Sequence, residues 1–311
     1  MENRNYTSVK EFVLLGLPHA DELTIPLFIL FLSIYVCTLL GNLLILVTVR
    51  VDPQLHTPMY FFLFNLSILD IWLSSVTLPN MLVNFLDVKK SISFSGCAMQ
   101  LYFFHFCAST ECFLYTVMAY DRYVAICHPL YYTKIMSKTV CLKMAAGTWL
   151  TGSIHSMIHT VLTFTLPFCR SNLIQYFFCD IPPILKLACS STYINETVIL
   201  ANIGMVGLGC FVLILVSYGH IILAILKIST AEGRRRTFST CASHLTVVIC
   251  FFGPPVVIYL RPHSLYSVDG AFAVFYTMVT PMLNPIIYTL RNKEVKSAIK
   301  KLNGRHTSIN I

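Results

Sequence analysis

Residues 25–49 read IPLFILFLSIYVCTLLGNLLILVTV, a run that contains no Asp, Glu, Lys or Arg. A helix needs about 20 consecutive, mostly apolar residues to cross the hydrocarbon core of a bilayer. Further windows of similar length carry at most one charge each, at residues 58–86, 91–120, 144–169, 197–226, 237–260 and 271–290. We therefore predict an all-α membrane protein: a seven-transmembrane helix bundle.

The composition excludes the main soluble classes. The chain has 311 residues, of which 56% are hydrophobic and 12% are charged, whereas a soluble domain carries about 25% charged residues. A disordered chain would need low hydrophobicity and high charge. No metalloprotease motif, nucleophile elbow or phosphate loop is visible, so we do not expect an enzyme. A transporter or channel remains an alternative, although no internal repeat supports it.

The basic residues indicate an orientation. Most of the 22 Lys and Arg residues fall on one side of the membrane if the C-terminus is cytoplasmic, as the positive-inside rule requires. The net charge of +8 then faces anionic lipid or an intracellular partner, and we expect no nucleic acid. The expected parts are an extracellular tail (1–24), the bundle (25–290), and a cytoplasmic amphipathic helix and tail (291–311). Asn5 begins a glycosylation sequon in the outer tail.

Two acids stand inside the predicted spans, where charge is costly and marks a candidate functional site. Asp70 and Glu111 lie at matched depths, roughly 18 and 16 Å from the inner ends of their helices at 1.5 Å per residue. Asn42 and Asn284 approach the same level from the first and last spans. Such a cluster invites a cation, bridging water or one retained proton. The alternative is a hydrogen-bonded knot that holds the helices together.

Asp121, Arg122 and Tyr123 stand at the inner end of the third span. An Arg beside its own acid can be held in an ion pair and later released, which would bias a two-state element. On spacing alone, an interface anchor with a snorkelling Arg explains the same pattern.

Cysteines gather in the longest outer loop. Cys169, Cys179 and Cys189 lie there, and Cys97 stands at the outer end of the third span. Four cysteines on the oxidising side allow three pairings, and the residue spacing does not choose among them.

Five motifs occur in order along the predicted spans: LHTPMY (55–60), MAYDRYVAIC (118–127), SY (217–218), TFSTCASHL (237–245) and PMLNPIIY (281–288). Together they resemble the rhodopsin-like G-protein-coupled receptors and, within them, the olfactory (odorant) receptors. The resemblance covers nearly the whole chain.

The resemblance implies a plasma-membrane receptor that binds a small odorant and activates the stimulatory olfactory G protein, raising cyclic AMP. It implies disulfides Cys97–Cys179 and Cys169–Cys189. Asp70, Glu111 and Asn284 match a sodium-type site, and no other cofactor is expected. Arg122 matches the arginine that engages the G protein, with Tyr218 and Tyr288 as its partners in the active state.

The resemblance also places the odorant in the outer half of the bundle. Candidate residues on the third span form one helical stripe that carries no Asp, Glu, Lys or Arg, so we expect a mostly neutral, apolar ligand. Plain packing of the bundle is the alternative for each aromatic residue. The candidates are Phe104, His105, Ala108, Ser109, Cys112, Asn202, Val206, Phe252, Pro255, Tyr259 and Thr277. We expect no metal site, and Tyr176 stands where some family members carry a proposed metal-binding His.

Overall fold

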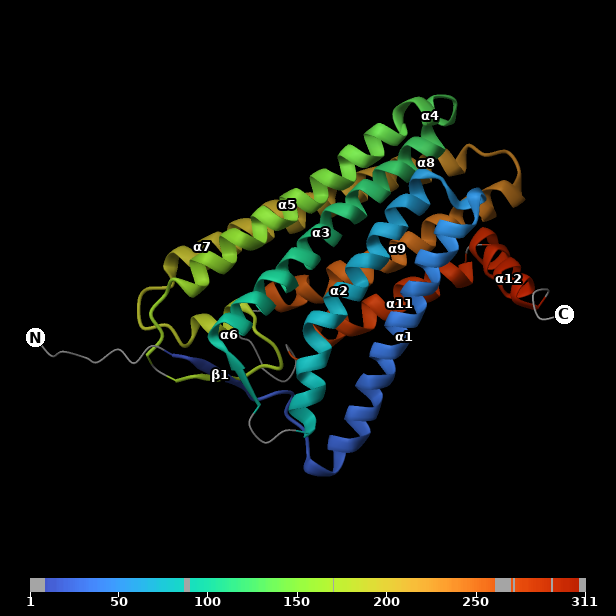
Figure 1. Cartoon of the computed structure of the whole chain (residues 1–311). Helices are drawn as coiled ribbons and strands as arrows, with labels where there is room; N and C mark the ends of the chain where they lie inside the picture. Colours follow the sequence, from blue (N-terminus) through green and yellow to red (C-terminus); the bar gives the residue numbers. More distant parts are fainter. Residues whose placement is uncertain are drawn as a thin grey trace, which may run out of the picture.

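The computed structural model describes residues 9–86, 90–169, 171–260, 270, 272–291 and 293–307. At residues 203–204, 236, 239–240, 243, 255–260, 289–291, 293 and 302–307, it describes the backbone alone. Long helices form a bundle through the described part of the chain, and a shorter helix follows them (Figure 1). They are α1 (Thr24–Val51), α2 (Pro58–Leu86), α3 (Phe94–Cys127), α5 (Lys138–Phe164), α7 (Tyr193–Asn202) with η4 (Ile203–Leu208) and α8 (Gly209–Leu226), α9 (Ala231–Leu260), η5 (Phe275–Val279) with α11 (Thr280–Arg291), and α12 (Lys293–Thr307).

The outer surface of the bundle is largely apolar, and its interior encloses polar side chains among apolar ones. Leu40 and Leu213 are 63% and 57% exposed, whereas Asn42 and Asp70 are fully buried. Lipid covers the exposed apolar side chains at no cost, while buried polar groups need partners. By length and apolar composition alone, three described helices could cross a membrane: Asp21–Val51, Pro58–Leu86 and Tyr193–Leu226. The other long helices of the described part carry more polar side chains, many of which point into the bundle.

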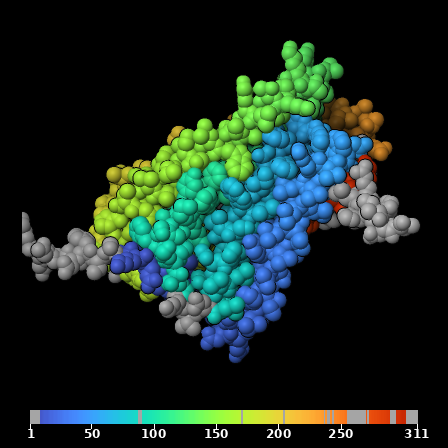
Figure 2. Space-filling model, in the orientation of Figure 1, coloured from blue at the N-terminus to red at the C-terminus, as the bar shows by residue number. Residues whose placement is uncertain are grey.

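Two glycines bring helices close together. A Cβ atom at Gly41 on α1 would lie 2.9 Å from Pro285 Cγ on α11. At Gly152 on α5, a Cβ atom would collide with Thr110 on α3. These contacts draw α1 towards the last helix of the bundle and α5 against α3. In the space-filling view, α1, α2, α3 and α5 pack side by side along the visible face (Figure 2).

One end of the bundle, here called the disulfide end, is covered by a small sheet. Its strands are β1 (Glu11–Leu14), β2 (Ser91–Ser93) and β3 (Leu173–Ile174), in the order β2-β1-β3. β1 pairs antiparallel with β2 (Phe12 opposite Ile92) and parallel with β3 (Val13 opposite Leu173). Phe12 is fully buried, with its ring 5.6 Å from that of Phe168. Burial of Phe12 and Leu14 explains why part of the segment expected as a tail is ordered.

The opposite end, here called the Arg122 end, is held by short elements and by α12. Its connections contain η2 (Pro53–Leu55), η3 (Pro129–Tyr131) and α4 (Tyr132–Ile135), whereas η1 (Asp21–Leu23) and α6 (Ile181–Leu185) lie at the disulfide end. Helix α12 buries Val295 and Ala298 against the bundle. Tyr60 Oη donates to Glu294 Oε2 at 2.7 Å, and Lys301 Nζ lies 3.3 Å from Asp52 Oδ2. This helix therefore docks against the start of α2 and the turn before it.

Candidate functional site

A buried polar cluster occupies the middle of the bundle. Asn284 Nδ2 on α11 donates to Asp70 Oδ1 and Oδ2 on α2, at 2.9 and 3.0 Å. It also lies 3.2 Å from the hydroxyl of Tyr115 on α3, a residue that the sequence analysis did not single out. Asn42 Nδ2 donates instead to the backbone oxygens of Thr38 and Pro281, at 3.0 and 3.1 Å. The structure therefore joins Asp70 and Asn284 directly, while Asn42 connects α1 to the backbone of α11.

Glu111 differs from the rest of this cluster because its carboxyl group lacks hydrogen-bond partners among the described residues. Its side chain is buried, yet neither Oε1 nor Oε2 has a hydrogen-bond partner among the described residues. The amide oxygens of Asn42 and Asn284 are also enclosed and unpaired. A buried carboxylate without a partner is costly, so it holds a proton or attracts a cation. The donor set consists of oxygen atoms, which suits a hard cation, although the described residues contain no group of three or more His, Cys, Asp or Glu side chains fit for a metal ion.

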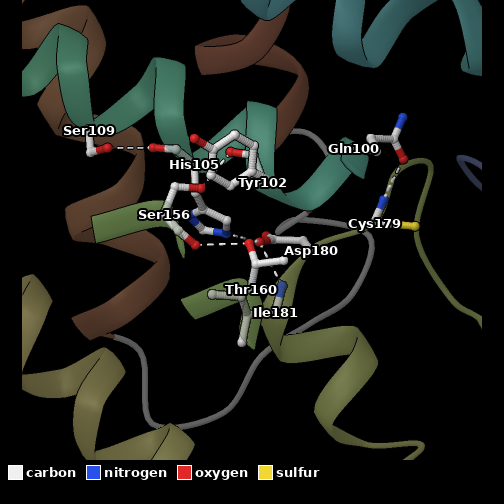
Figure 3. Close-up of polar contacts among 9 residues, drawn as sticks. All are labelled: Gln100, Tyr102, His105, Ser109, Ser156, Thr160, Cys179, Asp180 and Ile181. Atoms are coloured by element: carbon white, nitrogen blue, oxygen red, sulfur yellow. Dashed lines mark hydrogen bonds and ion pairs between the residues drawn. The ribbon is translucent and has the colours of Figure 1, made fainter. Parts of the chain in front are cut away.

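A second polar cluster lies at the disulfide end, between α3, α5 and the segment that leads into α6 (Figure 3). His105 Nε2 on α3 lies 3.2 Å from Asp180 Oδ1. The His105 ring also stacks 6.0 Å from the ring of His159 on α5. His159 in turn hydrogen bonds with Asn202 on α7. Two predicted ligand residues, His105 and Asn202, are thus linked through His159.

Asp180 is held firmly in place by its neighbours. It follows Cys179, which forms a disulfide with Cys97 at a Cα–Cα distance of 5.5 Å. The Cys179 backbone N–H donates to Gln100 Oε1 at 2.9 Å, and the Ile181 N–H donates to Asp180 Oδ1 at 2.8 Å (Figure 3). The second disulfide, Cys169–Cys189, closes the same loop. Asp180 is a site residue that the sequence analysis missed, because no periodic pattern marks a loop residue.

The other predicted ligand residues fall into two groups. Phe104 is buried, with its ring 4.7 Å from Phe178 and 6.1 Å from Tyr276, so it belongs to the aromatic surroundings of His105. Phe252 lies apart from this group, against Phe211 and Phe251.

Several predicted polar groups are already engaged. The Ser109 and Thr277 hydroxyls donate to backbone oxygens of their own helices, and the Cys112 side chain is buried. Ala108 and Val206 are half-buried. The side chains of Pro255 and Tyr259 lie outside the described part of the structure.

At the Arg122 end, the predicted ion pair is present. Arg122 Nε lies 3.6 Å from Asp121 Oδ2, an ion pair without a hydrogen bond. The Tyr132 hydroxyl, from α4, donates to Asp121 Oδ1 at 2.8 Å. Burial and the nearby Asp121 carboxylate raise the pKa of Tyr132, so its hydroxyl remains a donor at neutral pH. Tyr123 instead hydrogen bonds with His128 at 3.1 Å.

The two tyrosines assigned to Arg122 by resemblance have other surroundings in this structure. Tyr218 Oη lies 2.7 Å from His244 Nδ1, and the two rings stack at 5.7 Å. The Tyr288 hydroxyl is enclosed without a hydrogen-bond partner among the described residues. His244 is fully buried on α9, within the motif TFSTCASHL. This pairing joins α8 to α9 near Arg122, whose ion-pair partner among the described residues is Asp121.

The described helices have the fold of a seven-helix membrane bundle. The chain is similar to the crystal structure of squid rhodopsin, with a TM-score of 0.73 and 18% identity over 91% of this chain and 81% of that one. The predicted seven-transmembrane bundle is therefore confirmed.

The family follows from the sequence comparisons. The family model described as olfactory receptor matches residues 31–305. Human Olfactory receptor 10G7 is 59% identical over 96% of this chain and 97% of its own length, and human Olfactory receptor 10G4 is 59% identical over 97% of each. The chain belongs to the olfactory receptor family. It is a multi-pass plasma-membrane receptor for small ligands that acts through a G protein, and it is not an enzyme.

Proposed function

We propose that this chain is an odorant receptor for small, mostly neutral and apolar volatile molecules, which bind at the disulfide end. The observation that carries the proposal is the setting of His105. The rings of Phe104 and His159 lie 5.0 and 6.0 Å from its own, and its charged neighbour among the described residues, Asp180, is already paired with it. A site with an aromatic lining and a polar group that is already engaged favours an uncharged ligand with a single polar function.

The Arg122 end is the proposed coupling surface for the stimulatory olfactory heterotrimeric G protein, which raises cyclic AMP. Arg122 is restrained by an ion pair with Asp121 rather than by a full set of hydrogen bonds, so a modest rearrangement releases it. In this orientation the C-terminus is cytoplasmic and the N-terminus is extracellular. Exposed lysines of α12, such as Lys296 and Lys300, then face anionic membrane lipid. Asn5, the proposed glycosylation site, lies outside the described residues.

The central cluster is proposed to hold a sodium ion when the receptor is inactive. Glu111 would supply a free carboxylate, with amide oxygens from Asn42 and Asn284 nearby. The test is the affinity of an agonist measured across a sodium titration, in wild type, Asp70→Asn and Glu111→Gln. We expect sodium to lower agonist affinity in wild type and to have no effect in either variant. A wild-type receptor as insensitive as the variants would contradict the sodium proposal.

The ligand proposal is tested with a cyclic AMP reporter in cells that display tagged receptor. Neutral alcohols, esters and aldehydes are compared with amines and carboxylic acids. Phe104→Ala should lower agonist potency by about tenfold, the equivalent of about 1.4 kcal/mol of apolar contact. The matched control is Phe103→Ala, one residue away, where the ring packs against Trp72 on α2. Equal losses in both variants, or responses confined to charged ligands, would contradict the assignment.

A further inference from the structure

The chemistry of His105 is constrained by its partner. An ionised carboxylate accepts hydrogen bonds and donates none. Asp180 Oδ1 lies 3.2 Å from His105 Nε2, so this ring nitrogen must carry the proton. In a neutral imidazole the other nitrogen, Nδ1, is then an acceptor with a free lone pair. A partner that holds one ring nitrogen in this way determines what the other nitrogen can recognise.

Nδ1 of His105 is available to another molecule. It has no hydrogen-bond partner among the described residues, and it is not one of the enclosed, unpaired atoms of the interior. The His105 side chain retains 16% exposure. Its ring lies 5.0 Å from Phe104 and 6.0 Å from His159, and the side-chain amide of Asn202 is engaged with His159. His105 Nδ1 is therefore an accessible hydrogen-bond acceptor beside the rings of Phe104 and His159.

Asp180 is rigid enough to impose the tautomer. Its own oxygen accepts from the Ile181 N–H, and the preceding residue is fixed by the Cys97–Cys179 disulfide and by Gln100. The Asp180 side chain is 10% exposed, which limits competition from water. Rotation of the Asp180 side chain away from His105 would also break its hydrogen bond with the Ile181 N–H.

We propose that Asp180 is a positioning residue that holds His105 as the Nε2-protonated tautomer, so that Nδ1 accepts a hydrogen bond from a ligand hydroxyl. The receptor then selects alcohols over ethers and ketones of the same shape. An ether or ketone oxygen would bring a second acceptor against Nδ1, leaving both groups unpaired in an apolar site. This inference rests on the proposed ligand site at the disulfide end and specifies the ligand class it takes.

The decisive variant is Asp180→Ala. It removes Oδ1, the single atom that accepts from both the Ile181 N–H and His105 Nε2. The imidazole proton is then free to move to Nδ1, which becomes a donor for ethers and ketones. Asp180→Asn is the conservative variant, because its amide oxygen can occupy the Oδ1 position and accept both hydrogen bonds. The expected result is a selectivity change in Asp180→Ala that is absent in Asp180→Asn, rather than a general loss of activity.

The response assay uses octan-1-ol with octyl methyl ether, benzyl alcohol with benzyl methyl ether, and each agonist found for wild type with its methyl ether. In wild type we expect the alcohol to be at least about tenfold more potent than its ether. Asp180→Ala should reduce this ratio several-fold, Asp180→Asn should keep it, and His105→Phe should reduce it towards one. Asp21→Ala, the same truncation at an exposed position of η1, should leave it unaltered.

The tautomer is measured separately by ¹⁵N NMR of histidine-labelled receptor in detergent, with the His105 signals assigned through His105→Phe. We expect a protonated Nε2 in wild type and in Asp180→Asn, and a larger fraction of protonated Nδ1 in Asp180→Ala. This readout needs no agonist, so it remains informative if the proposed odorant function fails. An Nδ1-protonated wild type, best agonists without a hydroxyl, or equal potency losses for both members of each pair in Asp180→Ala would overturn the inference.

Discussion

The two ends of the bundle are stabilised by different kinds of interaction. At the disulfide end, two disulfides and a three-stranded sheet fix the loops around His105. At the Arg122 end, the described contacts are single hydrogen bonds and ion pairs, such as Tyr132 with Asp121 and Tyr218 with His244. Covalent and sheet contacts preorganise a site, whereas isolated polar contacts exchange readily. The difference is consistent with the proposed receptor, in which the ligand site stays fixed and the coupling surface rearranges.

The strongest test of this contrast removes the Cys97–Cys179 disulfide. Loss of a native disulfide typically costs about 2–5 kcal/mol. The double variant Cys97→Ala/Cys179→Ala should therefore lose surface expression and agonist response, measured by flow cytometry and the cyclic AMP reporter. The Cys169–Cys189 pair closes 20 residues rather than 82, so its removal should cost about 1 kcal/mol less. Cys37→Ala, at an exposed free cysteine, is the control. Normal expression of the Cys97 double variant would refute the stabilising role of this end.

Arg122→Ala should separate signalling from folding. Among the described residues the side chain makes an ion pair at 3.6 Å and no hydrogen bond, so we expect its removal to leave the bundle intact. We expect near-complete loss of agonist-evoked cyclic AMP with unchanged surface expression and ligand affinity. Arg50→Ala, at an exposed position near the same end, is the matched control. Retained signalling in Arg122→Ala would show that coupling runs through other residues.

Tyr132→Phe should have a smaller effect of the opposite sign. It removes the hydrogen bond to Asp121 Oδ1, worth about 1 kcal/mol, and so loosens the carboxylate that restrains Arg122. A change of this size alters a population ratio about fivefold. We expect agonist-independent cyclic AMP to rise several-fold. Tyr131→Phe alters the neighbouring tyrosine, which is 61% exposed, and should change nothing. Unchanged basal signalling in both variants would show that Tyr132 on α4 does not help to restrain Arg122.

The smallest effect is expected at Lys301. Its side chain is 52% exposed where it pairs with Asp52, and exposed ion pairs contribute about 1 kcal/mol or less. Lys301→Ala should lower the Tm of purified receptor by less than about 2 °C relative to Lys300→Ala. A much larger shift would mean that docking of α12 stabilises the whole Arg122 end.

The bundle could be predicted from sequence because its signal is simple. Apolar windows of sufficient length mark each span, and the window 58–86 coincides with α2. Depth along a helix predicted that Asp70 and Glu111 stand at one level, since rise per residue is constant. The structure joins Asp70 to Asn284, whereas Glu111 has no hydrogen-bond partner among the described residues. Charge patterns identified Asp121 and Arg122 as neighbours at a helix end.

The features that could not be predicted from sequence depend on contacts between segments that lie far apart along the chain. Asp180 acts through His105, 75 residues earlier, and Tyr218 meets His244 on another helix. Strand β1 has four residues and no periodic signature of its own. Phe12 becomes buried only because Phe94 and Phe168 surround it. Such partners have no fixed spacing, so pattern arguments within one helix do not find them.

Strand β1 also constrains the order of events during biosynthesis. It is the middle strand of its sheet, yet its partners are made much later: Ser91–Ser93 after two spans, and Leu173–Ile174 after four. Until then, Phe12 and Leu14 have nothing to pack against. The apolar side chains of β1 therefore stay exposed in the nascent chain while the translocon inserts more than half of the receptor. That interval leaves the segment open to capture by chaperones, and closure of the sheet marks its end.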